Sequence, residues 1–302
     1  MQIMEPARII FYDQIARNKR NSVFLMIIII AIFILFGFVI GMAFGRDYFI
    51  FIMIVSIIIS ILYVWIGFYN SDKIALASVG AKLADKSAYR NLYNSVESMS
   101  LASGMPMPKV YIMPGIQINA FATGRNPKNS VICVTKGAFE KLDKRELEGV
   151  IAHEMSHIAN YDIRFMTLTA VLVGMIAIIS EIFLRSLHFS GGNDRDNKAQ
   201  IIFILIGILL AILAPIVTYL VQMAISRKRE FSADATAIKF TRSPTGLVGA
   251  LRKIKNDSSS EKVRVSKAVA PLFMSDPFKR DLSNLWSTHP PIDKRIQILE
   301  KM

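Results

Sequence analysis

The sequence predicts a mainly α-helical integral membrane protein, in which four transmembrane helices carry a soluble α+β domain with a small β-sheet. Three observations predict this fold class. Of the 302 residues, 53% are hydrophobic; many of them gather in long runs; and the polar segments between these runs contain short β-branched stretches. A run of about 20 apolar residues is long enough to cross a bilayer as a helix.

The long apolar runs are the predicted transmembrane helices. Uncharged runs cover residues 23–43, 48–71 and 199–226, and a further run, 165–184, is apolar except for Glu181 near its end. The first run is too long for the core of a signal peptide, and another span follows it almost at once. Four crossings place both flanks of the spans on the same side of the membrane.

Basic residues orient these helices. Arg17, Lys19 and Arg20 precede the first span, and the basic run 227–229 follows the last. Positive residues are enriched on the cytoplasmic side, so both termini are predicted to be cytoplasmic. The formal charge of +13 is then explained by basic residues that orient the spans and that face anionic lipid at the membrane surface. Nucleic acid is not an expected partner, because no recognised binding motif accompanies the charge.

The spans divide the chain into four segments. Residues 1–71 hold an N-terminal segment and the first transmembrane hairpin, and residues 164–226 hold the second hairpin. Residues 72–163 and 227–302 are expected to be two parts of one soluble domain. A single cysteine, Cys133, excludes an intrachain disulfide and is expected to be a small buried hydrophobic residue.

The first soluble segment contains signals for both strands and a helix. β-branched or aromatic runs at 110–113, 118–123 and 131–135 predict three strands, with a turn at 124–127. The pattern then changes to that of a helix, which Asp143 is expected to cap together with Glu146 three residues later.

The predicted helix carries His153, Glu154 and His157. Residues four apart share a helical face, so both imidazoles can bind one metal ion, while Glu154 can reach a water on that ion without being a ligand. The alternative is a helix surface that carries His and Glu by coincidence. The histidines border an apolar stripe, which favours a cleft over a solvated face.

A catalytic zinc site normally needs a third protein ligand. Glu181 lies 24 residues beyond His157, about 36 Å away if the helix continues into the membrane, so it is rejected. Glu230 follows the last span on the same side as His157, and Asp234 lies one turn further, where it can orient a ligand histidine. The alternative is that both carboxylates only pair with neighbouring Arg and Lys.

Two segments carry a specific resemblance. The sequence HEMSHIANYD at 153–162, followed by SRKREFSADA at 226–235, resembles the HtpX family of membrane zinc metalloproteases, relatives of the type I CAAX prenyl endopeptidase. The segment NAFATG at 119–124 resembles the substrate-side strand of the family. THPP at 288–291, with Arg295 beyond it, resembles the C-terminal motif. Together these features cover most of the chain.

The resemblance implies a zincin-like catalytic domain with a thermolysin-like Glu-zincin site on the cytoplasmic face. His153, His157 and Glu230 are then the ligands of one Zn²⁺, and Glu154 is the catalytic base. Asp234 is expected to orient His153.

Substrate binding is predicted for five residues. The candidate residues are Asn119, Ala120, Phe121, Ala122 and His289. The strand at 118–123 is either an exposed edge that pairs with an extended polypeptide or an interior strand with no free edge. His289 either donates a hydrogen bond to the developing oxyanion or anchors the loop before Pro290, and we favour the anchoring role.

The expected function is zinc-dependent endoproteolysis of misfolded or damaged membrane proteins, a quality-control role in the stress response. The expected location is a prokaryotic inner membrane, with an organelle membrane as the alternative; the sequence does not indicate an oligomeric state. A catalytically inactive zinc-binding scaffold or chaperone subunit is the alternative function, although Glu154 would then have no reason to occupy the position of a general base. A zinc transporter is disfavoured, because the last two spans contain no histidine or cysteine.

Overall fold

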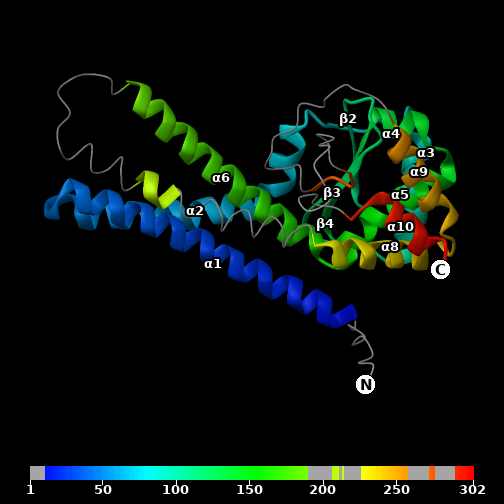
Figure 1. Cartoon of the computed structure of the whole chain (residues 1–302), viewed down its shortest axis with the longest axis horizontal. Helices are drawn as coiled ribbons and strands as arrows, with labels where there is room; N and C mark the ends of the chain where they lie inside the picture. The colour runs from blue at the N-terminus through cyan, green and yellow to red at the C-terminus, as the bar shows by residue number, and fades with distance from the viewer. Residues whose placement is uncertain (1–10, 190–205, 211–212, 214–225, 258–271, 276–289) are drawn as a thin grey trace.

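Three long helices, α1 (Phe11–Phe44), α2 (Arg46–Ser78) and α6 (Asp162–Phe189), extend side by side from an α/β domain (Figure 1). The computed structural model describes residues 11–189, 206–210, 213, 226–257, 272–275 and 290–302. The α/β domain is built from the segments before and after α6, so its two parts are far apart in the sequence.

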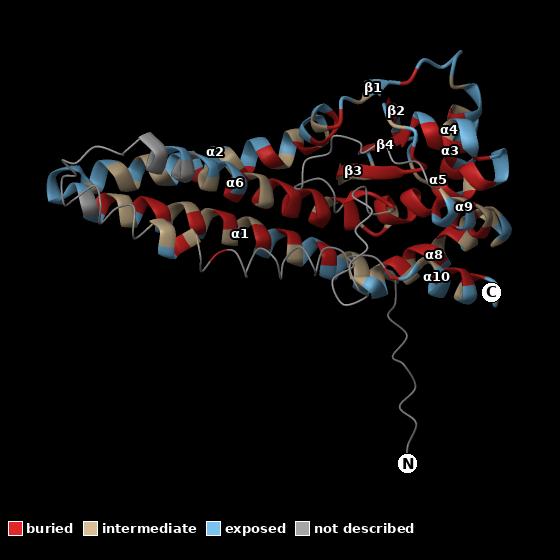
Figure 2. Cartoon of the chain, turned by 45° about the horizontal axis from the view of Figure 1, so that its top comes forward, coloured by how far each residue is buried: buried red, intermediate tan, exposed pale blue. Residues whose placement is uncertain are grey.

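Each long helix contains a stretch that is long and apolar enough to cross a membrane: Asp13–Met42, Arg46–Ser78 and Asp162–Glu181. The predicted spans 23–43, 48–71 and 165–184 all lie within these helices. The first reaches one residue beyond its apolar stretch, and the third reaches three residues beyond. The fourth predicted span, 199–226, falls mostly outside the described residues. Along α2 many large apolar side chains stay exposed (Figure 2), as expected where lipid takes the place of water.

The membrane helices begin and end differently from the prediction. α1 starts at Phe11, so the basic residues before the first predicted span lie inside the helix. The helix that carries the histidines, α5 (Lys144–Ala159), does not run on into the third span. Asn160 ends it, Tyr161 has a left-handed φ of 59°, and α6 starts at Asp162. This short break returns the chain toward the histidines.

A four-stranded mixed sheet lies beside α5. Its strands are β1 (Lys82–Leu83), β2 (Lys109–Met113), β3 (Ala120–Asn126) and β4 (Asn129–Thr135), in the order β1-β2-β4-β3. β4 pairs in parallel with β2 and antiparallel with β3, while β1 pairs antiparallel with β2. The three predicted strands correspond to β2, β3 and β4.

The turn predicted at 124–127 begins too early. Gly124 has a φ of 131° and lies at an irregularity in the β3–β4 register, through which β3 continues to Asn126. A Cβ atom on Gly124 would lie 2.2 Å from the carbonyl oxygen of Asn129. Glycine is therefore needed here for the close approach of two strands.

Helices cover α5 on its other sides. They are α3 (Arg90–Ser103), α8 (Arg227–Thr241) and α9 (Thr245–Asn256), with α10 (Ile292–Leu299) against α8 and α9 and the short α4 (Lys136–Lys141) after β4. The predicted N-terminal cap of α5 is confirmed. The Asp143 side chain accepts from the Glu146 N–H at 2.9 Å, and the Glu146 carboxylate accepts from the Asp143 N–H at 2.8 Å.

Candidate metal centre

His153, His157 and Glu230 converge between α5 and α8. Each offers one ligand atom, and these atoms lie within 4.8 Å of one another. His153 Nε2 lies 3.6 Å from one Glu230 oxygen, and His157 Nε2 lies 3.6 Å from the other. Two atoms that are each about 2.0–2.2 Å from a tetrahedral ion are about 3.3–3.6 Å apart. The spacing therefore fits a metal ion of this kind.

A buried nitrogen in this group supports the same fit. His153 Nε2 is buried and has no hydrogen-bond partner among the described residues. Leaving buried polar atoms unsatisfied is costly unless something else binds them. A cation between the two imidazoles and the Glu230 carboxylate would satisfy this nitrogen.

Asp234 and Arg295 hold His153 from the other side of its ring. Asp234 Oδ1 lies 2.9 Å from His153 Nδ1, which leaves Nε2 for a metal. The Arg295 guanidinium binds both oxygens of Asp234, at 2.6 and 2.8 Å. Burial opposes ionisation of Asp234, but Arg295 and the hydrogen bonds from His153 and Arg295 outweigh it and lower the pKa of Asp234 to about 2.

The protonation of His153 follows from the same contacts. Burial alone would lower the pKa of His153, but its contact with Asp234 and the nearby Glu230 carboxylate prevail and raise this pKa to about 9. The cluster of carboxylates thus favours a positive charge at this position. A bound metal ion would supply that charge in place of the proton.

A second carboxylate, Asp162, holds His157 in the same way. Its Oδ2 lies 3.0 Å from His157 Nδ1. The other oxygen accepts from Asn18 Nδ2 of α1 at 2.6 Å and pairs with Arg229 Nε of α8 at 3.0 Å. Asn18 also donates to the Asn160 carbonyl at 2.9 Å. The sequence analysis does not predict these roles of Asp162, Asn18 and Arg229. Asp162 does, however, lie five residues after His157, within the motif at 153–162.

Glu154 lies beside this group and is 1% exposed. Burial raises its pKa; the nearby His153 and His157 act in the opposite direction, as does a hydrogen bond from the Ala122 backbone. Because Ala122 belongs to β3, this contact joins the sheet to α5 at the candidate centre.

β3 lies at the edge of the sheet, as the predicted alternative of an edge strand requires. The outer side of β3 is nevertheless partly covered. Phe121 forms an antiparallel β-bridge with Phe273, and Met274 N–H donates to the Ala120 carbonyl at 2.9 Å. The Asn119 side chain exchanges two hydrogen bonds with the backbone of Ser275.

The remaining predicted substrate residues divide into two cases. The Phe121 side chain is fully buried and packs against Phe273, with ring centroids 5.0 Å apart, so it faces the core. His289 lies outside the described residues.

Comparison with known protein families gives a match over residues 86–302, which include every residue named for the metal ligands and the base. The chain belongs to peptidase family M48. Three curated relatives are each named protease HtpX homolog. The protein from Caldanaerobacter subterraneus subsp. tengcongensis is 47% identical over 246 residues, 80% of this chain and 82% of its own.

The other two M48 relatives align over nearly the full length. The Dictyoglomus thermophilum protein is 41% identical over 97% of this chain and 95% of its own. The Lactobacillus acidophilus protein is 40% identical over 96% and 99%. A crystal structure of S. mikatae Ste24p is 21% identical, with a TM-score of 0.49, over 88% of this chain and 61% of that one. The resemblance to the HtpX family is thus confirmed, together with the predicted class, a membrane metalloprotease.

Proposed function

We propose that this chain is a zinc-dependent endopeptidase, with His153, His157 and Glu230 as metal ligands and Glu154 as general base. The observation that carries the proposal is the convergence of three buried ligand atoms within 4.8 Å, with the buried Glu154 carboxylate beside them. In this proposal the α/β domain is zincin-like, and four spans hold it at the cytoplasmic face.

Each side chain of the centre has its own role in hydrolysis. Zinc, when bound, polarises a water molecule and the peptide carbonyl. Glu154 takes a proton from the attacking water and delivers it to the leaving amine. The raised pKa of Glu154 favours its keeping the proton between these two transfers, and the Ala122 N–H holds its carboxylate in place. Asp234 and Asp162 fix the histidine rings so that Nε2 of each faces the metal.

We place the substrate along the outer side of β3, because Ala122 lies beside Glu154. Main-chain hydrogen bonds would align an extended polypeptide there without demanding much sequence. Asn119 and Ala120 are engaged by residues 274–275, so the substrate either displaces this segment or extends beyond it. His289 remains a predicted oxyanion donor or loop anchor.

The position of the centre supports membrane-protein substrates. Only Asn160 and Tyr161 separate α5, which carries both histidines, from α6, so the centre lies at the end of a membrane span. Misfolded or damaged membrane proteins and their loops are within reach at this surface. We propose quality-control proteolysis in a prokaryotic inner membrane.

The test uses the full-length protein purified in detergent, with metal analysis and casein cleavage measured on the same samples. We expect one zinc per chain, cleavage that a chelator abolishes, and a Glu154→Gln variant that keeps zinc but loses about 10² to 10⁴ in rate. Glu148→Gln on the same helix is the matched control and should stay active.

Other outcomes would contradict the proposal in distinct ways. A wild-type protein that binds zinc without cleaving casein or unfolded membrane proteins would indicate the inactive scaffold. A Glu154→Gln variant that loses zinc together with activity would show that Glu154 has been assigned the wrong role.

A further inference from the structure

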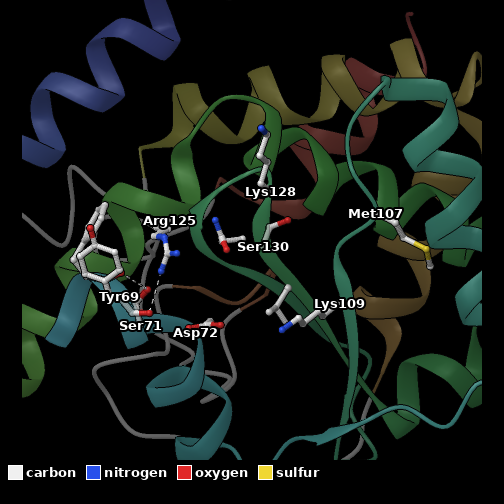
Figure 3. Close-up of a pocket in the computed structure, with 11 residues that line it drawn as sticks. Tyr69, Ser71, Asp72, Met107, Lys109, Arg125, Lys128 and Ser130 are labelled. Carbon is white, nitrogen blue, oxygen red and sulfur yellow. Dashed lines mark hydrogen bonds between the residues drawn. The ribbon is translucent and has the colours of Figure 1, made fainter. Parts of the chain in front are cut away.

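A hollow of about 160 Å³ lies where α2 meets the sheet, and it is lined by none of the candidate metal ligands. Its wall comes from Tyr69, Ser71 and Asp72 in the second half of α2, from Lys109 at the start of β2, and from the β3–β4 hairpin at Arg125, Lys128 and Ser130. In the view of Figure 3, Arg125 lies beside Tyr69 on one side and Lys109 lies on the other, with Asp72 between them.

The hollow carries an excess of positive charge. Lys109, Arg125 and Lys128 line it against one carboxylate, Asp72. Among the ion pairs of the described residues, none involves these three cations or Asp72. Unpaired cations gathered in one concave site favour an anionic ligand.

Arg125 is held in place but keeps donors for a ligand. Its Nη1 donates to the Tyr69 carbonyl at 3.3 Å, and its guanidinium lies 4.7 Å above the centre of the Tyr69 ring. This hydrogen bond uses one of the five N–H donors of a guanidinium, whose planar geometry suits phosphate. A positioned arginine with two flexible lysines beside it therefore fits a phosphate group.

The surroundings of the hollow indicate where that phosphate comes from. Trp65, Ile66 and Tyr69 of α2 are 58%, 47% and 46% exposed, and the Trp65 and Tyr69 rings are 5.4 Å apart. Trp65 and Tyr69 lie near the end of the predicted span 48–71, and exposed Trp and Tyr at the end of an apolar span mark the headgroup level of the bilayer. Tyr69 belongs both to this aromatic pair and to the wall of the hollow, so the hollow opens at the depth of lipid phosphates.

We propose that this hollow binds the phosphate group of an anionic phospholipid, whose acyl chains lie against the exposed face of α2. Lys109, Arg125 and Lys128 supply the positive charge, and Asp72 limits it to a net charge of two. Arg125 lies on β3, three residues after Ala122, which contacts Glu154. The bound lipid would thus hold the strand beside the candidate centre at a fixed depth relative to the membrane.

The test compares two variants of the full-length protein that differ equally from the wild type in net charge. K109Q/R125Q/K128Q removes the cations of the hollow, and K86Q/K136Q/K144Q removes three exposed lysines outside it. Phosphatidylglycerol retained on each protein is measured by native mass spectrometry after transfer from nanodiscs of phosphatidylcholine with phosphatidylglycerol. We expect at least a tenfold loss of bound phosphatidylglycerol for the first variant and none for the second.

Three results would overturn the proposal. Equal loss in both triple variants would mean that lipid binds through diffuse charge, and no loss in either would mean that the hollow is not the site. Inorganic phosphate that binds the wild type as tightly as the lipid does would point to a soluble phosphate instead. The folding of each variant is checked by its unfolding temperature in pure phosphatidylcholine and by its zinc content. If the triple variant does not fold, the single variant Lys128→Gln, at an exposed position, is compared with the wild type in the same way.

Discussion

His157 Nδ1 lies 3.0 Å from Asp162 Oδ2, so a residue in the first turn of a membrane helix orients a candidate metal ligand. The chain returns to His157 because Tyr161 takes a left-handed conformation between α5 and α6. The partner of the other histidine, Asp234, comes instead from α8. Each imidazole thus has its own carboxylate, on a different helix.

Replacing Asp162 by Asn should weaken metal binding. The amide cannot supply the negative charge that His157 and Arg229 face, and loss of such partners typically costs 10- to 100-fold in metal affinity. A competition titration of zinc against a chelator measures this directly. Asp293→Asn is the control, because Asp293 is an exposed carboxylate paired with Lys255. An Asp162→Asn variant with unchanged affinity would show that the contact is not used to position the histidine.

Asn18→Ala should weaken zinc binding by a smaller factor, a few-fold. In the part of the chain that the structure describes, Asn18 makes no hydrogen bond to the histidine; it holds Asp162 through a hydrogen bond of 2.6 Å from α1. Ser22→Ala is a matched control on the same helix, because Ser22 is also buried and bonds only to the Asn18 carbonyl among the described contacts. Equal zinc affinities for the two variants would mean that α1 packs against the centre without supporting it.

Arg295→Ala should destabilise the fold by about 3 kcal/mol or more, because it leaves the buried Asp234 carboxylate without its cation. Arg295→Lys should recover part of this loss, since lysine restores the charge but cannot bind both oxygens. Denaturant unfolding measures both. The control is Arg252→Ala, which breaks an exposed pair with Glu300 and should cost less than about 1 kcal/mol. Similar costs at the two positions would contradict the buried network.

Features with a local signal are predictable from the sequence. The cap of α5 needs only Asp143 and Glu146 three residues apart, and the shared face of His153 and His157 needs only helical spacing. Both are found as expected. The three strands are also predicted in type, because β-branched runs bounded by Gly, Pro and Asn carry their own signal.

The rest depends on contacts between distant segments. Arg295 reaches Asp234 from 61 residues further along the chain, and Asn18 reaches Asp162 across 144 residues. No periodicity or local motif encodes these distances. The pairing of residues 272–275 with the outer side of β3 is also not predictable from the sequence, because this short segment shows no strand pattern.

Gly149→Ala should lower stability by about 1–3 kcal/mol through overpacking. A Cβ atom at this position of α5 would lie 2.4 Å from the Leu247 backbone nitrogen of α9, and backbone cannot move aside as a flexible side chain can. Thermal unfolding measures the change, with Lys144→Ala at an exposed position of the same helix as control. A Gly149→Ala variant as stable as the control would mean that α9 is not packed this closely.

Cys133 should resist alkylation in the folded protein. It lies in β4, the strand between β2 and β3, where it is 0% exposed and pairs in register with Tyr111 and Phe121. Burial raises the pKa of the thiol, and alkylation requires the thiolate, so both access and chemistry oppose the reaction. The measurement is labelling with iodoacetamide at pH 8, with and without denaturant.

A Ser87→Cys variant provides the exposed thiol for comparison, since Ser87 lies in a surface turn. We expect its new thiol to react rapidly, while Cys133 reacts only as the sheet opens. Removing zinc should then speed labelling of Cys133, because a metal that binds only the folded state suppresses opening in proportion to its occupancy. If a chelator leaves the Cys133 rate unchanged while zinc is lost, the metal centre and the sheet open independently, and the Ala122–Glu154 contact does not couple them.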